Sequence, residues 1–219
     1  MTIKEALEQR HSVRQFEEKS IDEELVVKLK AGIETVNKES GLHVQMFNDE
    51  PEAFQANKPS YGQFSGCRNY FAMVGGKGMD EKIGYYGQQL VLFSQQLGLN
   101  TCWVALTYKK GGVNPKISSG EKLYIIIALG YGKTQGASHK LKEMSAVSDL
   151  SSDSPDWYRN GMEAALLAPT AMNQQKFRFS RSGNKVSAKA GMGFYTKIDL
   201  GIVKYNFEIG AGKENFIWV

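Results

Sequence analysis

The stretch NYFAMVGGKGMDEKIGYYGQQLVLFSQQLGLNTCWVAL, residues 69–106, carries the signals of a strand, a helix and a second strand in succession. The run 69–76 is apolar, rich in β-forming residues and closed by two glycines, which predicts a buried strand. From Asp80 the apolar residues recur at spacings of three and four, which predicts a helix over 80–97. The apolar run 101–106 predicts another buried strand. The stretch therefore indicates a fold in which helices and strands alternate.

Elements of the same kinds are expected on both sides of this stretch. Before it we expect helix 2–9, a helix over 22–37 that opens with a Ser20–Glu23 capping box, and strand 42–47. After it we expect strand 123–131, helix 155–167 opening at Ser154-Pro155, strands 176–180 and 185–190, helix 196–209 and strand 214–219.

The order helix, strand, strand, helix, strand thus occurs twice along the chain. Both copies end alike, in GLNTCWV and in GKENFIWV. We predict two related halves, about 1–147 and 154–219, that together form one domain. The alternative is that any chain of alternating helices and strands produces this order by itself.

Composition narrows the class of protein. The 219 residues include 27 Lys and Arg against 23 Asp and Glu, a net charge of +4. This excess suits a small anionic ligand and is too sparse for a nucleic-acid surface. Cys67 and Cys102 are far apart and the three histidines lack metal-ligand spacing, so neither a disulfide framework nor a metal site is expected. No apolar run is long enough to span a bilayer, and we expect a cytoplasmic protein without a membrane partner.

The segment RHSVR, residues 10–14, has the chemistry of an anion site. Two guanidiniums lie two residues apart with a hydroxyl between them, a set suited to a phosphate. The alternative is a solvated charged face at the end of a helix, where cations are favoured anyway.

A second candidate is APTAMNQQ, residues 168–175, which follows a helix that Pro169 cannot continue. Its small residues allow a close approach of the backbone to a planar ligand. Thr170, Asn173 and Gln175 offer a hydroxyl and amides to a heteroaromatic edge. The alternative is an ordinary loop that ends a helix.

Three other features of the sequence are weaker indications of a binding or catalytic site. The glycines of GYGKTQG, residues 130–136, are spaced GxGxxxG and are not followed by an apolar helical period, so a Rossmann site is not expected. HKLK, residues 139–142, brings positive charge to a phosphate or is a solvated loop. Cys102 lies within an apolar strand and is expected to serve packing.

Together these segments resemble the FMN-dependent nitroreductase family. RHSVRQF (10–16) matches its Arg-x-Ser-x-Arg/Lys-x-Phe motif, LVLFSQQLGLNTCW (90–103) its helix, Gly-Leu-Gly and strand segment, and APTAMNQQKFRF (168–179) its Pro-Ser-x-x-Asn-x-Gln-Pro-Trp-x-Phe loop. LYIIIALGYGK (123–133), followed by HKLK, resembles its final strand, Gly-Tyr-Pro turn and basic tail. The resemblance implies an α+β fold with three layers, α/β/α, and a mixed, mainly antiparallel sheet.

The order of the motifs departs from the usual pattern of the family. Most members carry the Pro-Ser-x-x-Asn loop soon after the arginine motif and build each FMN site at a dimer interface. Here the matching loop lies in the second half. The resemblance then implies one FMN per chain, bound between the halves, in a monomer with pseudo-two-fold halves or in a homodimer. Ala105-Leu106 stands where members commonly have Glu-Gly.

The resemblance also implies roles for individual residues. Arg10, with Lys140 or Lys142, would hold the FMN phosphate, Ser12 would contact the phosphate or the ribityl chain, and Arg14 would approach the pyrimidine edge. The full expected set is Arg10, His11, Ser12 and Arg14, the backbone of Val104, Ala105 and Leu106 near the flavin N5, Lys140 and Lys142, and Pro169, Thr170, Ala171, Asn173 and Gln175 along the ring. Tyr61, Phe64 and Tyr108 are candidates for an open stacking face, or pack within their loops.

The implied reaction has two steps. NADH or NADPH reduces the flavin and leaves, and a small-molecule acceptor such as a nitroaromatic or a quinone then takes the electrons, so no catalytic side chain is expected. Two other functions stay open: an FMN-binding protein that senses or stores the cofactor with little turnover, and a basic module that binds nucleic acid or protein.

Overall fold

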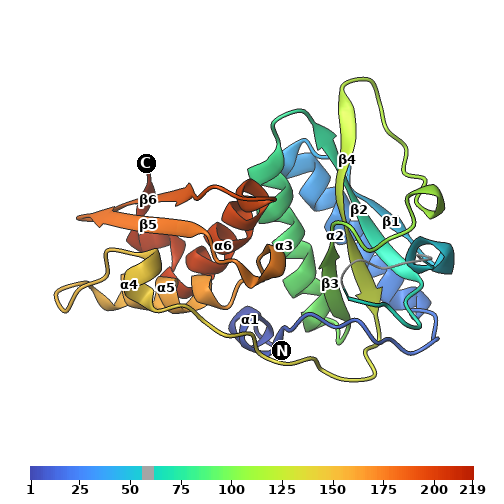
Figure 1. Cartoon of the computed structure of the whole chain (residues 1–219), viewed down its shortest axis with the longest axis horizontal. Helices are drawn as coiled ribbons and strands as arrows, with labels where there is room; N and C mark the ends of the chain where they lie inside the picture. Colours follow the sequence, from blue (N-terminus) through green and yellow to red (C-terminus); the bar gives the residue numbers. More distant parts are fainter. Residues whose placement is uncertain (56–61) are drawn as a thin grey trace. The chain divides into compact units, whose positions relative to one another are not determined.

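The computed structural model describes residues 1–55 and 62–219, which divide into two compact units (Figure 1). The first unit comprises Met1, Gln9–Met79 and Leu90–Ser138, and the second comprises Thr2–Glu8, Asp80–Gln89 and His139–Val219. Helices and strands occur in both units, which confirms the α+β class, and the described strands form two separate sheets. The expected halves, 1–147 and 154–219, stay a prediction.

The sheet of the first unit has four antiparallel strands in the order β1-β2-β4-β3. The strands are β1 Gln45–Phe47, β2 Asn69–Gly76, β3 Asn100–Val104 and β4 Glu121–Gly130. Alternate residues of β2, such as Tyr70 and Ala72, join one buried cluster, while Phe71 and Met73 between them are also fully buried. Both faces of β2 are therefore covered, which is why its sequence is apolar throughout.

Helix α2, Glu23–Ser40, contacts β1 and ends at Gly41, which takes the left-handed conformation with φ 71°. The start of α2 differs from the prediction. The N-cap residue is Asp22, whose side chain makes no capping hydrogen bond, and the Ser20 hydroxyl donates to the Asp49 carboxylate. The predicted capping box is therefore wrong, because Ser20 has a partner distant in sequence.

The sheet of the second unit has three strands in the order β5-β6-β7. The strands are β5 Phe177–Ser182, β6 Lys185–Ala190 and β7 Ile217–Trp218, and the helices of this unit are most of α1 Ile3–Gln9, the first part of α3 Asp80–Gln96, α4 Met144–Val147, α5 Asp156–Leu166 and α6 Thr196–Ala211. Short 3-10 turns occur at Pro51–Phe54 and Lys110–Gly112 in the first unit and at Ala171–Asn173 and Lys213–Asn215 in the second.

Glycines let α6 approach its neighbours at backbone distance. A Cβ added to Gly201 would collide with the carbonyl oxygen of Glu81 on α3, and one added to Gly84 would collide with that of Ile198 on α6. At the other end of α6, Gly210 meets the carbonyl oxygen of Asn160 on α5 in the same way. These contacts fix α6, whose first turn supports the loop described below.

The two copies of the element order differ in strand pairing. In the second unit β7 pairs directly with β6 and runs parallel to it, whereas in the first unit β4 lies between β2 and β3.

The start of α5 is shifted by one residue from the expected N-cap at Ser154. The N-cap is Pro155, and the Ser154 hydroxyl accepts a hydrogen bond from the Ser151 amide. Within residues 1–55 and 62–219, no helix combines the length and the apolarity needed to cross a membrane.

Candidate functional site

The arginine segment, residues 10–14, lies along the outer edge of β3. Ser12 forms a parallel bridge with Thr101, and the Val13 amide donates to the Thr101 carbonyl oxygen at 3.0 Å. Val13 is buried in the core cluster of the first unit. Backbone pairing therefore sets the register of the segment and brings its side chains beside Cys102, although the two lie about ninety positions apart in the sequence.

Three side chains of the arginine segment lie near Cys102. The Ser12 hydroxyl hydrogen-bonds to the Cys102 thiol, and the charges of Arg10 and Arg14 both act on it. Burial nevertheless raises the pKa of this thiol, so it is neutral. Arg10 is 4% exposed, and burial lowers its pKa to about 10, which leaves the guanidinium protonated at neutral pH. The structure thus holds positive charge in a largely buried place, and the sequence analysis missed Cys102 as its neighbour.

Of the other expected residues of the first unit that the structure describes, Leu106 is exposed and the rest are buried or half-buried. His11 is half-buried, and a Cβ added to Gly136 would lie 2.7 Å from its Cβ. Val104 is buried at the end of β3, whereas Leu106 is 70% exposed. Phe64 and Tyr108 pack against the core cluster. Tyr61 lies outside the described residues.

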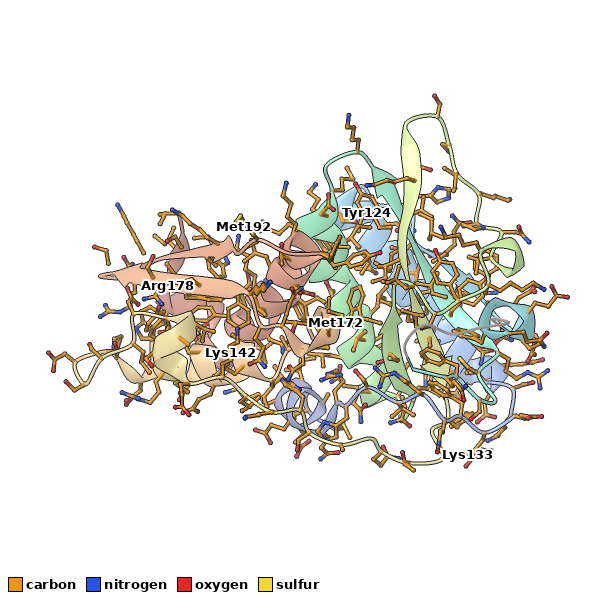
Figure 2. The ribbon with its side chains drawn as sticks, in the orientation of Figure 1. Tyr124, Lys133, Lys142, Met172, Arg178 and Met192 are labelled. Carbon is orange, nitrogen blue, oxygen red and sulfur yellow. The ribbon has the colours of Figure 1, made fainter. Side chains whose placement is uncertain are left out.

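In the second unit, the 168–175 loop lies against the segment that carries Lys140 and Lys142. Gln175 Nε2 and Asn173 Nδ2 both donate to the Lys140 carbonyl oxygen, at 2.8 and 2.9 Å. The Lys142 amide donates to Gln175 Oε1 at 2.9 Å, and its Nζ donates to the Gln175 carbonyl oxygen at 3.1 Å. Two expected parts of the site, which are 33 positions apart, are therefore joined within one unit; Figure 2 labels Lys142 and Met172 on them.

The polar side chains of this loop shape the loop itself. Gln175 is 2% exposed, its amide nitrogen also donates to Asn173 Oδ1 at 2.8 Å, and its backbone amide donates to Thr170 Oγ1 at 3.1 Å. Pro169 and Ala171 are half-buried beside them. Contact of these residues with a ligand ring stays a prediction, and the role visible here is to fix the loop.

Asp199, in the first turn of α6, is a residue that the sequence analysis missed. Its Oδ1 accepts the Ala171 amide at 3.0 Å, and its Oδ2 accepts Gln174 Nε2 at 2.8 Å. Burial raises the pKa of Asp199 to about 6, against the effect of these two bonds. The sequence signal was a carboxylate between two apolar residues, Ile198 and Leu200.

Comparisons with known proteins agree with this architecture. The model of a protein family described as "Putative TM nitroreductase" matches residues 2–211. Among solved structures, a "putative nitroreductase" from Thermotoga maritima has 23% identity and a TM-score of 0.66, with 96% of this chain and 83% of that chain covered. A search of curated proteins found no match.

Two further structures share the fold at lower identity. A nitroreductase-like protein from Streptococcus mutans has 11% identity and a TM-score of 0.54, covering 67% of this chain and 96% of its own. A variant of NfnB, an FMN and NADPH-dependent nitroreductase from Sphigopyxis sp. strain HMH, has 15% identity and a TM-score of 0.53, covering 69% and 100%. These likenesses show the fold, and the family match spans nearly all of the sequence. The chain belongs to the nitroreductase family.

Proposed function

We propose that this chain is an FMN-dependent oxidoreductase that passes electrons from NADH or NADPH to small acceptors such as nitroaromatics or quinones. Family membership supports an oxidoreductase, and one relative of the same fold is by name FMN and NADPH-dependent. The observation that carries the proposal is the placement of Arg10, Ser12 and Arg14 along the edge of β3, beside Cys102.

The charges of the first unit fit a phosphate. Arg10 stays protonated although it is buried, and a buried cation is stabilised when an anion binds beside it. Ser12 adds a neutral donor, and the half-buried Arg14 is the proposed cation at the pyrimidine edge of the flavin. His11 is the neighbour proposed to border the same phosphate group.

Two further cations and a shaped loop of the second unit belong to the proposal. Lys140 and Lys142 are our proposed additional phosphate contacts. The 168–175 loop, with Pro169, Thr170, Ala171, Asn173 and Gln175, is the proposed lining of the flavin ring.

When bound, FMN would supply the redox chemistry by accepting a hydride from the nicotinamide and passing electrons to the acceptor. The chain would position it: the backbone of Val104, Ala105 and Leu106 is the proposed donor region for the flavin N5. Leu106, where the family commonly has glycine, is 70% exposed and presents an apolar side chain at this point.

The visible spectrum of the purified protein tests the proposal. We expect a yellow protein with flavin absorbance and about one FMN per chain. Anaerobic addition of NADH, and separately of NADPH, should bleach the flavin bands, and a nitroaromatic or quinone should restore them. A colourless protein that takes up no added FMN would contradict the proposal. A yellow protein that neither nucleotide bleaches would favour the alternative, an FMN-binding protein with little turnover.

Oligomeric state and location belong to the same proposal. Size-exclusion chromatography with light scattering distinguishes the expected monomer from the expected homodimer. Cell fractionation tests the expected cytoplasmic location.

A further inference from the structure

The 168–175 loop has a backbone that needs external support. Met172, Asn173 and Gln175 have φ values of 50°, 52° and 44°, which is the left-handed region. Residues with a side chain rarely adopt this region, and such conformations persist only when the surroundings enforce them. Three of them within four positions indicate that specific contacts hold the loop.

Asp199 supplies two of these contacts, one on each side of the left-handed pair. Its Oδ1 accepts the backbone amide of Ala171, and its Oδ2 accepts the side chain of Gln174. Gln174 Nε2 also donates to the Phe194 carbonyl oxygen at 2.8 Å. A single carboxylate therefore brackets Met172 and Asn173.

The carboxylate is held rigidly beneath the loop. Asp199 is 3% exposed, and it lies two residues before Gly201, where α6 meets the backbone of α3. A buried charge destabilises a fold unless its partners compensate for the lost water. The rise in the pKa of Asp199 indicates that its two partners compensate only in part. Global stability thus does not explain why a carboxylate stands at this position.

We propose that Asp199 is a positioning residue that fixes the backbone of the 168–175 loop for binding of the flavin ring. Oriented acceptors on a rigid helix reduce the conformational freedom that the loop would otherwise lose on binding. The part of this inference that concerns the flavin rests on the proposed function; the part that concerns the loop does not.

Three variants of the full chain test the proposal. Asp199→Ala removes both acceptors. Asp199→Asn keeps one acceptor but turns an NH₂ group towards the Gln174 donor, so one of the two bonds is lost. Asp153→Asn removes an exposed carboxylate of the same unit and is the control. Hydrogen exchange of the apo protein reports on the loop, and quenching of FMN fluorescence reports on the Kd.

We expect exchange at Ala171 to rise at least tenfold in Asp199→Ala and a few-fold in Asp199→Asn, with exchange in β5 and β6 unchanged. The FMN Kd should rise at least fivefold in Asp199→Ala and less in Asp199→Asn. At pH 7 the urea midpoint of Asp199→Asn should equal or exceed that of the wild type, because a buried charge is gone. A looser loop in a protein of equal or greater stability is a result that a purely structural role does not produce.

Other outcomes overturn the inference. Unchanged loop exchange in Asp199→Ala, or a rise spread equally over the whole second unit, rules out specific positioning. Faster hydrogen exchange in the loop with an unchanged FMN Kd would rule out a role of Asp199 in binding but would leave the proposed function intact. If the wild type itself fails to bind FMN, the proposed function and the binding role fail together, and the exchange data alone decide whether Asp199 fixes the loop.

Discussion

The arginine segment and the 168–175 loop reach their shapes by different means. Residues 10–14 are held by backbone pairing with the edge of β3 and by the buried side chain of Val13. The loop is held by side chains, chiefly Asp199 and Gln175, against an unfavourable backbone. We therefore expect changes of the cations in the first region to preserve the register, and polar changes in the second region to alter the conformation of the loop. Four predictions test this difference.

The largest loss of stability is expected from Gly201→Ala, which disturbs the packing of α6, the helix that carries Asp199. The added methyl group would meet the backbone of Glu81 and Tyr85 on α3, which cannot rotate away as a side chain can. We expect a loss of about 3 kcal/mol or more in the free energy of unfolding, measured in urea. Gly111→Ala is the control, since nothing lies within 4 Å of its added Cβ. Equal urea midpoints for the two variants would show that α6 does not depend on this contact.

Stability should also depend on pH through Asp199. The pKa of Asp199 is raised from 3.8 to about 6, so between these values the folded chain holds a proton that the unfolded chain has released. This contribution is present at pH 4 and is lost as pH rises through about 6, with an upper limit of roughly 3 kcal/mol. Urea unfolding from pH 4 to 7 should show the decrease in the wild type and a flatter profile in Asp199→Asn. Parallel profiles would mean that Asp199 does not titrate in this range.

Arg10→Ala tests the cations of the first region. Loss of one charged hydrogen bond to a phosphate is worth about 1.5–3 kcal/mol, or roughly a 10- to 150-fold rise in the FMN Kd. Exchange in the 168–175 loop should stay unchanged. Arg10→Lys should recover part of the affinity, and Lys133→Ala, at an exposed position of the same unit, is the control. An FMN affinity that is the same in Arg10→Ala and the wild type would remove the phosphate assignment.

The smallest effect is expected from Gln175→Ala. The change removes the side-chain acceptor of the Lys142 amide and one of the two side-chain donors to the Lys140 carbonyl oxygen, at a cost of about 1–2 kcal/mol. Exchange at Lys142 and Asn173 should accelerate, with little change in the arginine segment. Glu163→Ala, at an exposed position of α5, is the control. If both variants exchange alike at Lys142, backbone contacts alone hold this segment.

Much of the fold followed from local signals. Strands β2 and β6 were predicted to the residue, and α3 to within one, because apolar periodicity and flanking glycines act over a few positions. The predicted capping box was wrong because of a partner distant in sequence: Ser20 was expected to cap a helix but bonds to Asp49.

The sequence by itself determined the class of the fold, the order of its elements, the family resemblance and the two segments that carry cations and small polar residues. These follow from residue type and spacing, because the preferences that form helices, strands and turns act between residues close together in the sequence. Only the tertiary structure decided that β7 pairs with β6, that Arg10, Ser12 and Arg14 gather at Cys102, and that Asp199 supports the loop. Such choices depend on which distant groups meet when the chain packs, and a buried carboxylate acquires its role only from the donors that packing brings to it.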